Sequence, residues 1–348
     1  MIKIIADENL RDIEFLCSSW ADVTLVSPDR ISNSNLADND VLLVRSVTKV
    51  DANLLKNSNI KFVGTPTSGI NHIDIQYLEK NKIEFSHAPG CNSNSVVDFV
   101  MSSLCTLLAG TNFKKINVGI VGFGNIGSKL GNCLRKFEIP FKVFDPFKKI
   151  NKHYDQCLSL YDLSDCDVVT LHTPLTRNGD FPTYQMIDER FLKLLKKDSI
   201  LINTSRGGVV NEPSMINYIN NYNHLKLVLD VWENEPNINQ DLLILTEFST
   251  PHIAGHSTTG KKNGIHKIIN DLISFLSINS SPLKKHPPSF HISNIKSLND
   301  YMKNLDKIYK VKLDSDTFKK QIKSSKSIGN SFSLLRKNYP ERQEINYE

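Results

Sequence analysis

The feature that most constrains the fold is a glycine-rich turn between a short apolar run and a segment expected to be helical. Gly122, Gly124 and Gly127 follow apolar residues 118–121, and the expected helix spans residues 125–136. A strand, a tight glycine turn and a helix in this order are typical of a βαβ unit that binds a dinucleotide. The first glycine permits the turn, the second lets the backbone approach a pyrophosphate, and the third lets helix and strand pack closely.

The residues around this turn also indicate which dinucleotide is bound. The pyrophosphate would lie at the helix N-terminus, beside Asn125 and Ile126. Asp145 ends the next apolar run, where a carboxylate accepts hydrogen bonds from the ribose hydroxyls and repels a 2′-phosphate. The sequence therefore predicts NAD rather than NADP. A glycine turn with a capping aspartate that binds nothing is the alternative reading, and the flanking strand and helix argue against it.

The alternation of β-rich and helix-compatible segments predicts two doubly wound parallel-sheet domains. Short β-rich runs in the first part of the chain span residues 2–6, 22–26, 41–46, 60–65 and 83–88. In the second part we expect strands at 118–121, 141–145, 167–172, 199–203 and 226–231. Helices expected at Val96–Leu108 and 258–278 would carry the chain into the second domain and back to the first.

These segments suggest three parts of the chain. We expect residues 1–93 with 257–280 to form a flavodoxin-like substrate-binding domain, and residues 94–256 to form a Rossmann NAD-binding domain. A proline-rich stretch at 280–288 reads as a linker. Residues 281–348 are lysine-rich and too few to bury much core alone, so we expect them to pack against the main body or a partner subunit.

Composition narrows the class of protein. The net charge of +5 over 348 residues is slight and predicts no nucleic-acid partner. No apolar run approaches the ~18 residues of a membrane helix, and the first residues read as a strand rather than a signal peptide. Six scattered cysteines without a Cys-x-x-Cys pair favour a reduced, cytoplasmic protein and predict no metal site.

Three polar side chains stand just past apolar runs downstream of the glycine turn. They are Arg206 after 199–203, Glu235 after 226–230, and His252 after 248–250. Ligands of an open parallel sheet bind outside the carboxyl ends of its strands, so we expect all three side chains near the cofactor.

The three residue types match the needs of hydroxy-acid oxidation. His252 is the natural base for a hydroxyl proton because imidazole titrates near neutrality. Glu235 would orient that ring, and Arg206 offers a planar, permanently charged fork for a carboxylate. Taken singly, each is more often a rim charge or a turn residue. Together beside a dinucleotide site, they predict hydride transfer.

The residues around this set resemble a known family. The segments Asn203–Val210, Asp230–Pro236 and Thr250–Gly255 resemble those of the D-isomer-specific 2-hydroxyacid dehydrogenases. Further matching segments are Asp7–Asn9, Val44–Val50, Phe62–Asp74, Ala88–Asn92 and Leu335–Arg342. The resemblance covers nearly the whole chain and is weakest between residues 280 and 330.

The resemblance implies roles for individual residues. It implies Arg206, Glu235 and His252 as the catalytic residues, Ser46 and Thr67 as substrate contacts, and a homodimer built through the carboxyl-terminal segment. The implied NAD contacts are Asp145, Thr173, Thr204, Ser205, Arg206, Asp230 and Gly255. His256 stands where the family commonly has a tyrosine, so we expect an imidazole rather than a phenol at this substrate-binding position.

The leading hypothesis is NAD-dependent oxidation, at C2, of a small phosphorylated D-2-hydroxy acid. The nearest alternative is the same chemistry on another D-2-hydroxy acid, such as 3-phosphoglycerate. An alternative of a different class is a binding protein that senses NAD(H) on the same fold without catalysis. The presence of all three candidate catalytic residues favours an enzyme.

Overall fold

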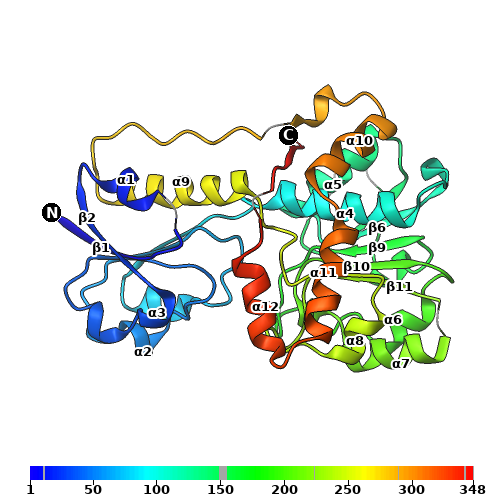
Figure 1. Ribbon diagram of the computed structural model, residues 1–348, viewed down its shortest axis with the longest axis horizontal. Helices are drawn as coiled ribbons and strands as arrows, with labels where there is room; N and C mark the ends of the chain where they lie inside the picture. The colour runs from blue at the N-terminus through cyan, green and yellow to red at the C-terminus, as the bar shows by residue number, and fades with distance from the viewer. Residues whose placement is uncertain (11, 149–154, 223, 289, 341, 348) are drawn as a thin grey trace. The chain divides into compact units, whose positions relative to one another are not determined.

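The computed structural model describes residues 1–10, 12–148, 155–222, 224–288, 290–340 and 342–347. The chain divides into two compact units, one formed by residues 1–92 and 258–287 and the other by residues 93–257 and 288–348. Each unit is built on a parallel β-sheet with helices on both faces (Figure 1). Among the described residues, no helix combines the length and the apolar character needed to cross a membrane.

The sheet of the first unit has five parallel strands in the order β2-β1-β3-β4-β5, the flavodoxin-like order. The strands are β1 (Ile2–Asp7), β2 (Ala21–Val26), β3 (Val41–Leu43), β4 (Phe62–Thr65) and β5 (Glu84–His87). Successive side chains of a strand face opposite sides of the sheet. Ile4 and Leu43 therefore enter one apolar core, while Ile5 and Leu42 enter the other.

Helices cover both faces of this sheet. Helices α1 (Ile13–Cys17) and α9 (Thr258–Phe275) line one core, and α2 (Ala52–Leu55) and α3 (Ile75–Lys80) line the other. Helix α9 begins at Thr258, as the sequence predicts, and ends three residues before the predicted Ile278. Its buried face includes Ile265, Ile268, Ile269 and Leu272, which follow the helical repeat.

The sheet of the second unit has seven parallel strands in the order β12-β11-β10-β9-β6-β7-β8, which is the Rossmann order extended by one strand. They are β6 (Val118–Val121), β7 (Phe141–Phe144), β8 (Asp155–Gln156), β9 (Val168–Leu171), β10 (Ile200–Asn203), β11 (Lys226–Leu229) and β12 (Phe248–Ser249). Strand β6 pairs with both β7 and β9, so the strand order reverses there. The glycine turn that follows β6 thus lies at the topological switch point, where such sheets bind ligands.

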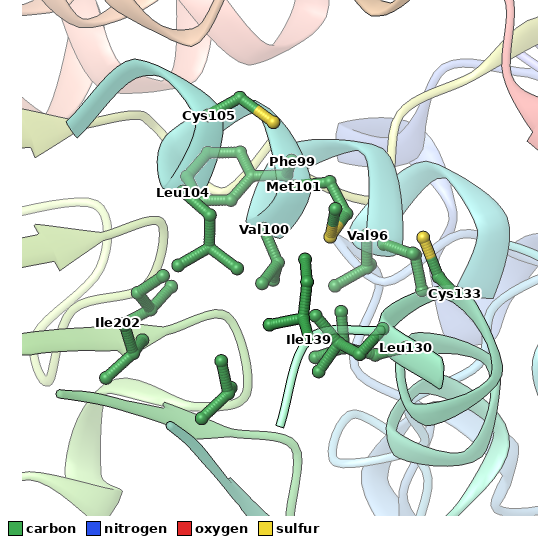
Figure 2. Close-up of a cluster of buried hydrophobic side chains, with 14 of the residues drawn as sticks. Val96, Phe99, Val100, Met101, Leu104, Cys105, Leu130, Cys133, Ile139 and Ile202 are labelled. Carbon is green, nitrogen blue, oxygen red and sulfur yellow. The ribbon is translucent and has the colours of Figure 1, made fainter. Parts of the chain in front are cut away.

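Two helical layers enclose this second sheet (Figure 1). Helices α4 (Ser93–Leu107), α5 (Asn125–Lys136) and α10 (Leu298–Ile308) share one core with the sheet. Helices α6 (Glu189–Leu194), α7 (Glu212–Tyr222), α8 (Gln240–Leu245) and α12 (Ile328–Lys337) share the other core. Figure 2 shows Val96, Val100 and Leu104 of α4 converging with Leu130 of α5 in the first of these cores.

The carboxyl-terminal residues are integral to the second unit. Helix α11 (Val311–Lys323) places Val311 in one core and Phe318 in the other. Strand β13 (Phe290–His291) pairs in parallel with β14 (Ile345–Asn346), which packs against α4. The sequence suggested a separate segment at 281–348. Residues 288–348 instead lie in the second unit because their apolar side chains complete cores that α4–α8 and the sheet leave open.

Phe318→Ala tests this packing. Phe318 is 1% exposed and its ring contacts those of Trp232 and Phe332. Its removal is expected to lower the free energy of unfolding of the second unit by about 3–5 kcal/mol. Urea unfolding followed by Trp232 fluorescence, in a Trp20→Phe background, measures this. Leu313→Ala, at a site 63% exposed on the same helix, is the control and should stay within about 0.5 kcal/mol. If both variants lower the free energy of unfolding equally, the side chain of Phe318 does not contribute to the core of the second unit.

Candidate active site

The three glycines of the turn after β6 occupy three different environments. Gly122 has a φ of +87°, and a Cβ there would lie 2.8 Å from the carbonyl oxygen of His172. A Cβ at Gly127 would lie 2.1 Å from the carbonyl oxygen of Gly122, so only glycine lets α5 pack on the turn. A Cβ at Gly124 would meet nothing within 4 Å. The turn is therefore closed at both ends and open at its middle, as close approach of a pyrophosphate requires.

Helix α5 begins at this open middle. Gly124 is its N-cap and has no side chain with which to cap the first turn of the helix. The first backbone N–H groups of any helix lack intrahelical partners, and the helix dipole favours negative charge there. Asn125 and Ile126, the predicted pyrophosphate contacts, are the first two residues of α5. The end of α5 thus offers an anion site.

Asp145 lies directly after β7, beside the glycine turn. Its carboxylate accepts hydrogen bonds from the backbone N–H groups of Phe123, at 2.8 Å, and Phe147, at 3.0 Å. The Phe123 bond ties the end of β7 to the turn itself. A carboxylate in this place suits ribose hydroxyls and disfavours a 2′-phosphate, which fits NAD.

Thr173 supplies an independent observation on the fit of a cofactor. Its Oγ1 is buried and has no hydrogen-bond partner among the described residues. Its Cγ2 would lie 3.0 Å from a Cβ on Gly122, so the side chain abuts the turn. Buried hydroxyls without partners are rare, because an unmade hydrogen bond is costly. The open middle of the turn, the carboxylate of Asp145 and this hydroxyl together fit NAD.

His172 is a buried histidine whose ring bonds to neighbouring threonine hydroxyls. Burial lowers its pKa to about 3, so the imidazole is uncharged. Its Nε2 lies 3.0 Å from Oγ1 of Thr170, and its Nδ1 lies 3.2 Å from Oγ1 of Thr204. The hydroxyl of Ser205 donates to Asn203 Oδ1 at 2.8 Å. The hydroxyls of Thr204 and Ser205, both predicted to contact the cofactor, thus bond within the protein.

Arg206 lies on the loop after β10. It is the N-cap residue of the short helix η5 (Gly207–Val209), and its Nη1 donates to the carbonyl of Ser205 at 2.7 Å. A Cβ on Gly207 would overlap the carbonyl carbon of Trp232, at 1.8 Å, so this loop lies directly on the segment that leads to Glu235. Burial lowers the pKa of Arg206 and the charge of Glu235 opposes that shift. A guanidinium stays protonated in proteins, so the group is a permanent cation.

Trp232 connects the loop of Glu235 to the turn of His252. Its backbone N–H donates to Oε1 of Glu235 at 3.0 Å, and its indole Nε1 donates to the carbonyl of Thr250 at 3.0 Å. The sequence does not predict Trp232 as a site residue, although Trp232 lies in the family-like segment Asp230–Pro236. The sequence does offer one indication of its role. A tryptophan just past a buried strand is expected to be buried as well, and its indole N–H then needs a hydrogen-bond partner nearby.

Glu235 and His252 form the central pair of the site. Oε2 of Glu235 lies 2.7 Å from Nδ1 of His252. Burial alone would raise the pKa of Glu235, but the charges of His252 and Arg336 and the bonds from His252 and Trp232 hold it below its ordinary value. A carboxylate only accepts, so Nδ1 of His252 carries a hydrogen and Nε2 is the nitrogen that can take a proton. The His252 side chain is 32% exposed, so it is accessible to a substrate.

The backbone of His252 is held in an uncommon conformation. Its φ of +57° lies in the left-handed region, which costs of order 1–3 kcal/mol unless the surroundings impose it. Oδ1 of the buried Asp230 imposes it by accepting from Thr250 Oγ1 (2.7 Å), Ile253 N (2.7 Å) and Ala254 N (3.0 Å). The N–H of His252 itself donates to the carbonyl of Asp230 at 2.7 Å.

The remaining predicted residues lie in both units. Ser46, in the first unit, is exposed past the end of β3, and the hydroxyl of Thr67 donates to the carbonyl of Gly69 at 2.7 Å. Gly255 and His256 belong to the second unit and continue the turn of His252.

The structure brings Arg206, Glu235, His252 and Asp230 together on the carboxyl ends of neighbouring strands. A cation, a carboxylate–imidazole pair and a dinucleotide site suit proton transfer coupled to hydride transfer.

Comparison with known proteins bears directly on this site. The family model of the D-isomer specific 2-hydroxyacid dehydrogenase, NAD binding domain, matches residues 104–254. Erythronate-4-phosphate dehydrogenase of Marinomonas sp. (strain MWYL1) is 37% identical, over 99% of this chain and 93% of that relative. The protein of the same name from Wigglesworthia glossinidia brevipalpis is 42% identical, over 79% of this chain and 73% of that relative.

Solved structures show a similar fold. NAD⁺-bound 3-phosphoglycerate dehydrogenase of Entamoeba histolytica superimposes with a TM-score of 0.67 at 22% identity, over 82% of this chain and 99% of that one. D-Lactate dehydrogenase of Aquifex aeolicus, complexed with NAD and lactic acid, gives a TM-score of 0.62 at 22% identity, over 79% of this chain and 95% of that one. At these identities the likeness concerns the fold.

Two glycine variants separate the roles of the turn. Gly127→Ala is expected to lower both the melting temperature and the affinity for NADH, because its Cβ cannot fit against the Gly122 carbonyl. Gly124→Ala should leave the melting temperature unchanged and lower the affinity for NADH about tenfold, because its Cβ would occupy only the space through which a pyrophosphate approaches. Thermal melts and titration of NADH fluorescence measure both. An NADH affinity within twofold of wild type in Gly124→Ala would contradict this placement of the cofactor.

Proposed function

The chain belongs to the erythronate-4-phosphate dehydrogenases, within the D-isomer-specific 2-hydroxyacid dehydrogenase family, and from this premise we propose that it oxidises 4-phospho-D-erythronate with NAD. Oxidation at C2 gives (R)-3-hydroxy-2-oxo-4-phosphooxybutanoate, a step we place in pyridoxal 5′-phosphate biosynthesis. The observation that carries the proposed chemistry is the 2.7 Å contact between Glu235 and His252.

His252 is the proton acceptor in this proposal. Its Nδ1 hydrogen is engaged by Glu235, so Nε2 takes the proton of the C2 hydroxyl as the carbonyl forms. The imidazolium that results lies against a carboxylate whose lowered pKa keeps it ionised. Glu235 therefore fixes the ring and stabilises its charged form. When bound, NAD supplies the acceptor for the hydride that leaves C2.

Arg206 binds the substrate carboxylate and the emerging carbonyl oxygen. Its guanidinium is a permanent cation on a loop fixed by the contact of Gly207 with Trp232. A carboxylate adjacent to C2 would place the reacting carbon beside the same cation. Loss of positive charge here should affect the reaction more than the binding of NADH.

We assign the cofactor contacts to the second unit. We assign the pyrophosphate to the turn from Gly122 to Gly127 and the ribose to Asp145. Thr173, Thr204, Ser205, Arg206, Asp230 and Gly255 complete the proposed set. Support comes from the buried Oγ1 of Thr173 and the open space at Gly124. Thr204 and Ser205 would contact NAD through their backbone, since their hydroxyls bond within the protein.

Substrate identity depends on the first unit. We assign Ser46 and Thr67 to substrate binding, with His256 of the second unit. Ser46 is exposed, and Thr67 must exchange its bond to the Gly69 carbonyl before it can donate to an anion. We also propose a homodimer built through the carboxyl-terminal segment, in the cytoplasm. All six cysteines lie in the described residues as thiols, which suits a reducing compartment.

A substrate panel tests the proposed reaction. Formation of the oxidised product is measured with 4-phospho-D-erythronate, 3-phosphoglycerate and D-lactate, with a different 2-oxo acid present to reoxidise any tightly bound NADH. We expect turnover with 4-phospho-D-erythronate at a kcat/KM at least about 100-fold above that of either competitor. Preference for 3-phosphoglycerate would reject the substrate assignment. NADH binding without turnover of any acid would favour a cofactor sensor.

A further inference from the structure

The carboxyl-terminal segment from Tyr339 to Tyr347 has no part in the chemistry proposed above, although it overlaps the family-like segment Leu335–Arg342. It belongs to the second unit, where Glu344 accepts from the hydroxyl of Ser257 at 2.5 Å and Tyr347 donates to Asp98 at 2.6 Å. The segment is thus tied both to helix α4 and to the residue that follows the turn of His252.

Arg342 is the residue of this segment that reaches the turn. Its Nη2 donates to the carbonyls of Ala254, at 2.7 Å, and Ile253, at 3.5 Å, and its Nε donates to the carbonyl of His256 at 3.1 Å. Arginine is rarely buried without compensating partners, yet Arg342 is only 5% exposed. Three backbone carbonyls of the catalytic turn therefore converge on one guanidinium.

The surroundings of Arg342 fix its orientation. The guanidinium lies over the ring of Tyr309, with 4.0 Å between its central carbon and the ring centroid. Nη2 also donates to Oγ of Ser95, which in turn donates to the carbonyl of Ala254 at 2.7 Å. The Tyr339 ring meets that of His256 edge to face, with 6.1 Å between centroids.

The turn is consequently held from two sides. Asp230 accepts from the backbone N–H groups of Ile253 and Ala254, and Arg342 donates to the carbonyls of the same two residues. His252 precedes them with a φ of +57°. A residue in this conformation keeps it only where the neighbouring chain is fixed. One side of that constraint comes from the end of β11 and the other from the carboxyl terminus.

We propose that Arg342 is a positioning residue for the reaction: it holds the turn from Ile253 to His256 so that His252 stays aligned with Glu235. The proposal rests on the function proposed above for His252. Among the described residues, Arg342 bonds to the backbone carbonyls of Ile253, Ala254 and His256 and to the hydroxyl of Ser95. It bonds to neither side chain of the Glu235–His252 pair, so it acts through the turn. The carboxyl-terminal segment is thereby part of the active-site architecture.

Arg342→Ala and Arg342→Lys test this role in the full-length protein. We expect Arg342→Ala to lower kcat about 10–100-fold, since small displacements of a catalytic group have effects of this size. KM for 4-phospho-D-erythronate and the Kd of NADH should change less than about threefold. Arg342→Lys, which keeps a charge and a donor, should lie between Arg342→Ala and wild type. Low concentrations of guanidinium should restore part of the kcat of Arg342→Ala.

Tyr347→Phe is the matched control. Tyr347 lies on the same terminal segment as Arg342. The substitution removes its hydroxyl contacts to Asp98 and Tyr301 and leaves the contacts of the catalytic turn in place. It should lower the melting temperature and leave kcat within about twofold. An unchanged kcat in Arg342→Ala, or an equal loss of kcat in Tyr347→Phe, would overturn the proposal. If Arg342→Ala does not fold, the kcat and KM of Arg342→Lys decide.

Hydrogen exchange separates this proposal from the proposed reaction. Exchange of a peptide covering residues 250–257 is measured in the unliganded protein, so it does not depend on turnover. Faster exchange in Arg342→Lys, confined to this peptide, supports the positioning role of Arg342 even if 4-phospho-D-erythronate proves not to be the substrate. Exchange equal to that of wild type rejects the positioning role of Arg342 even if the reaction is confirmed.

Discussion

One oxygen of a buried carboxylate organises the active site. Oδ1 of Asp230 accepts from Thr250 Oγ1, Ile253 N and Ala254 N, and so joins the end of β11 to the turn after β12. Burial raises the pKa of Asp230, and these hydrogen bonds with the nearby charge of His252 oppose that shift. The left-handed backbone of His252, the direction of its side chain and its contact with Glu235 all depend on this connection. A parallel sheet supplies such a site because neighbouring strands end at one edge.

Two carboxylates near one histidine have opposite environments and hence different roles. Asp230 is 1% exposed and bonds to backbone and hydroxyl groups, so it fixes geometry. Glu235 is partly exposed, its pKa is held below the ordinary value, and it contacts the imidazole directly. The family resemblance implies Asp230 as an NAD contact, and this contact remains a prediction for Oδ2. Its Oδ1 is fully occupied by the turn, which spacing along the chain cannot reveal.

Much of the second unit could be predicted because its signals are local. The strand at 118–121 and the helix at 125–136 follow from apolar runs on either side of fixed glycines, and the structure has both with these bounds. The family match and the catalytic candidates depend on short motifs at strand ends. The carboxyl-terminal residues include the matching segment Leu335–Arg342, but that motif does not indicate what these residues contact. Tyr301 contacts Phe137, 164 residues before it, and Phe318 contacts Trp232, 86 residues before it. Arg342 binds the carbonyls of Ile253, Ala254 and His256, so the partners of these three residues are set by tertiary packing.

The central claim is that Glu235 acts through His252, and a double-mutant cycle tests it most directly. Single-turnover formation of NADH from 4-phospho-D-erythronate is measured in wild type, Glu235→Gln, His252→Asn and the double variant. His252→Asn should slow the step ~10²–10⁴-fold. The double variant should be no more than about threefold slower than His252→Asn alone, because Glu235 has no imidazole left to orient. Losses that multiply in the double variant would contradict the account.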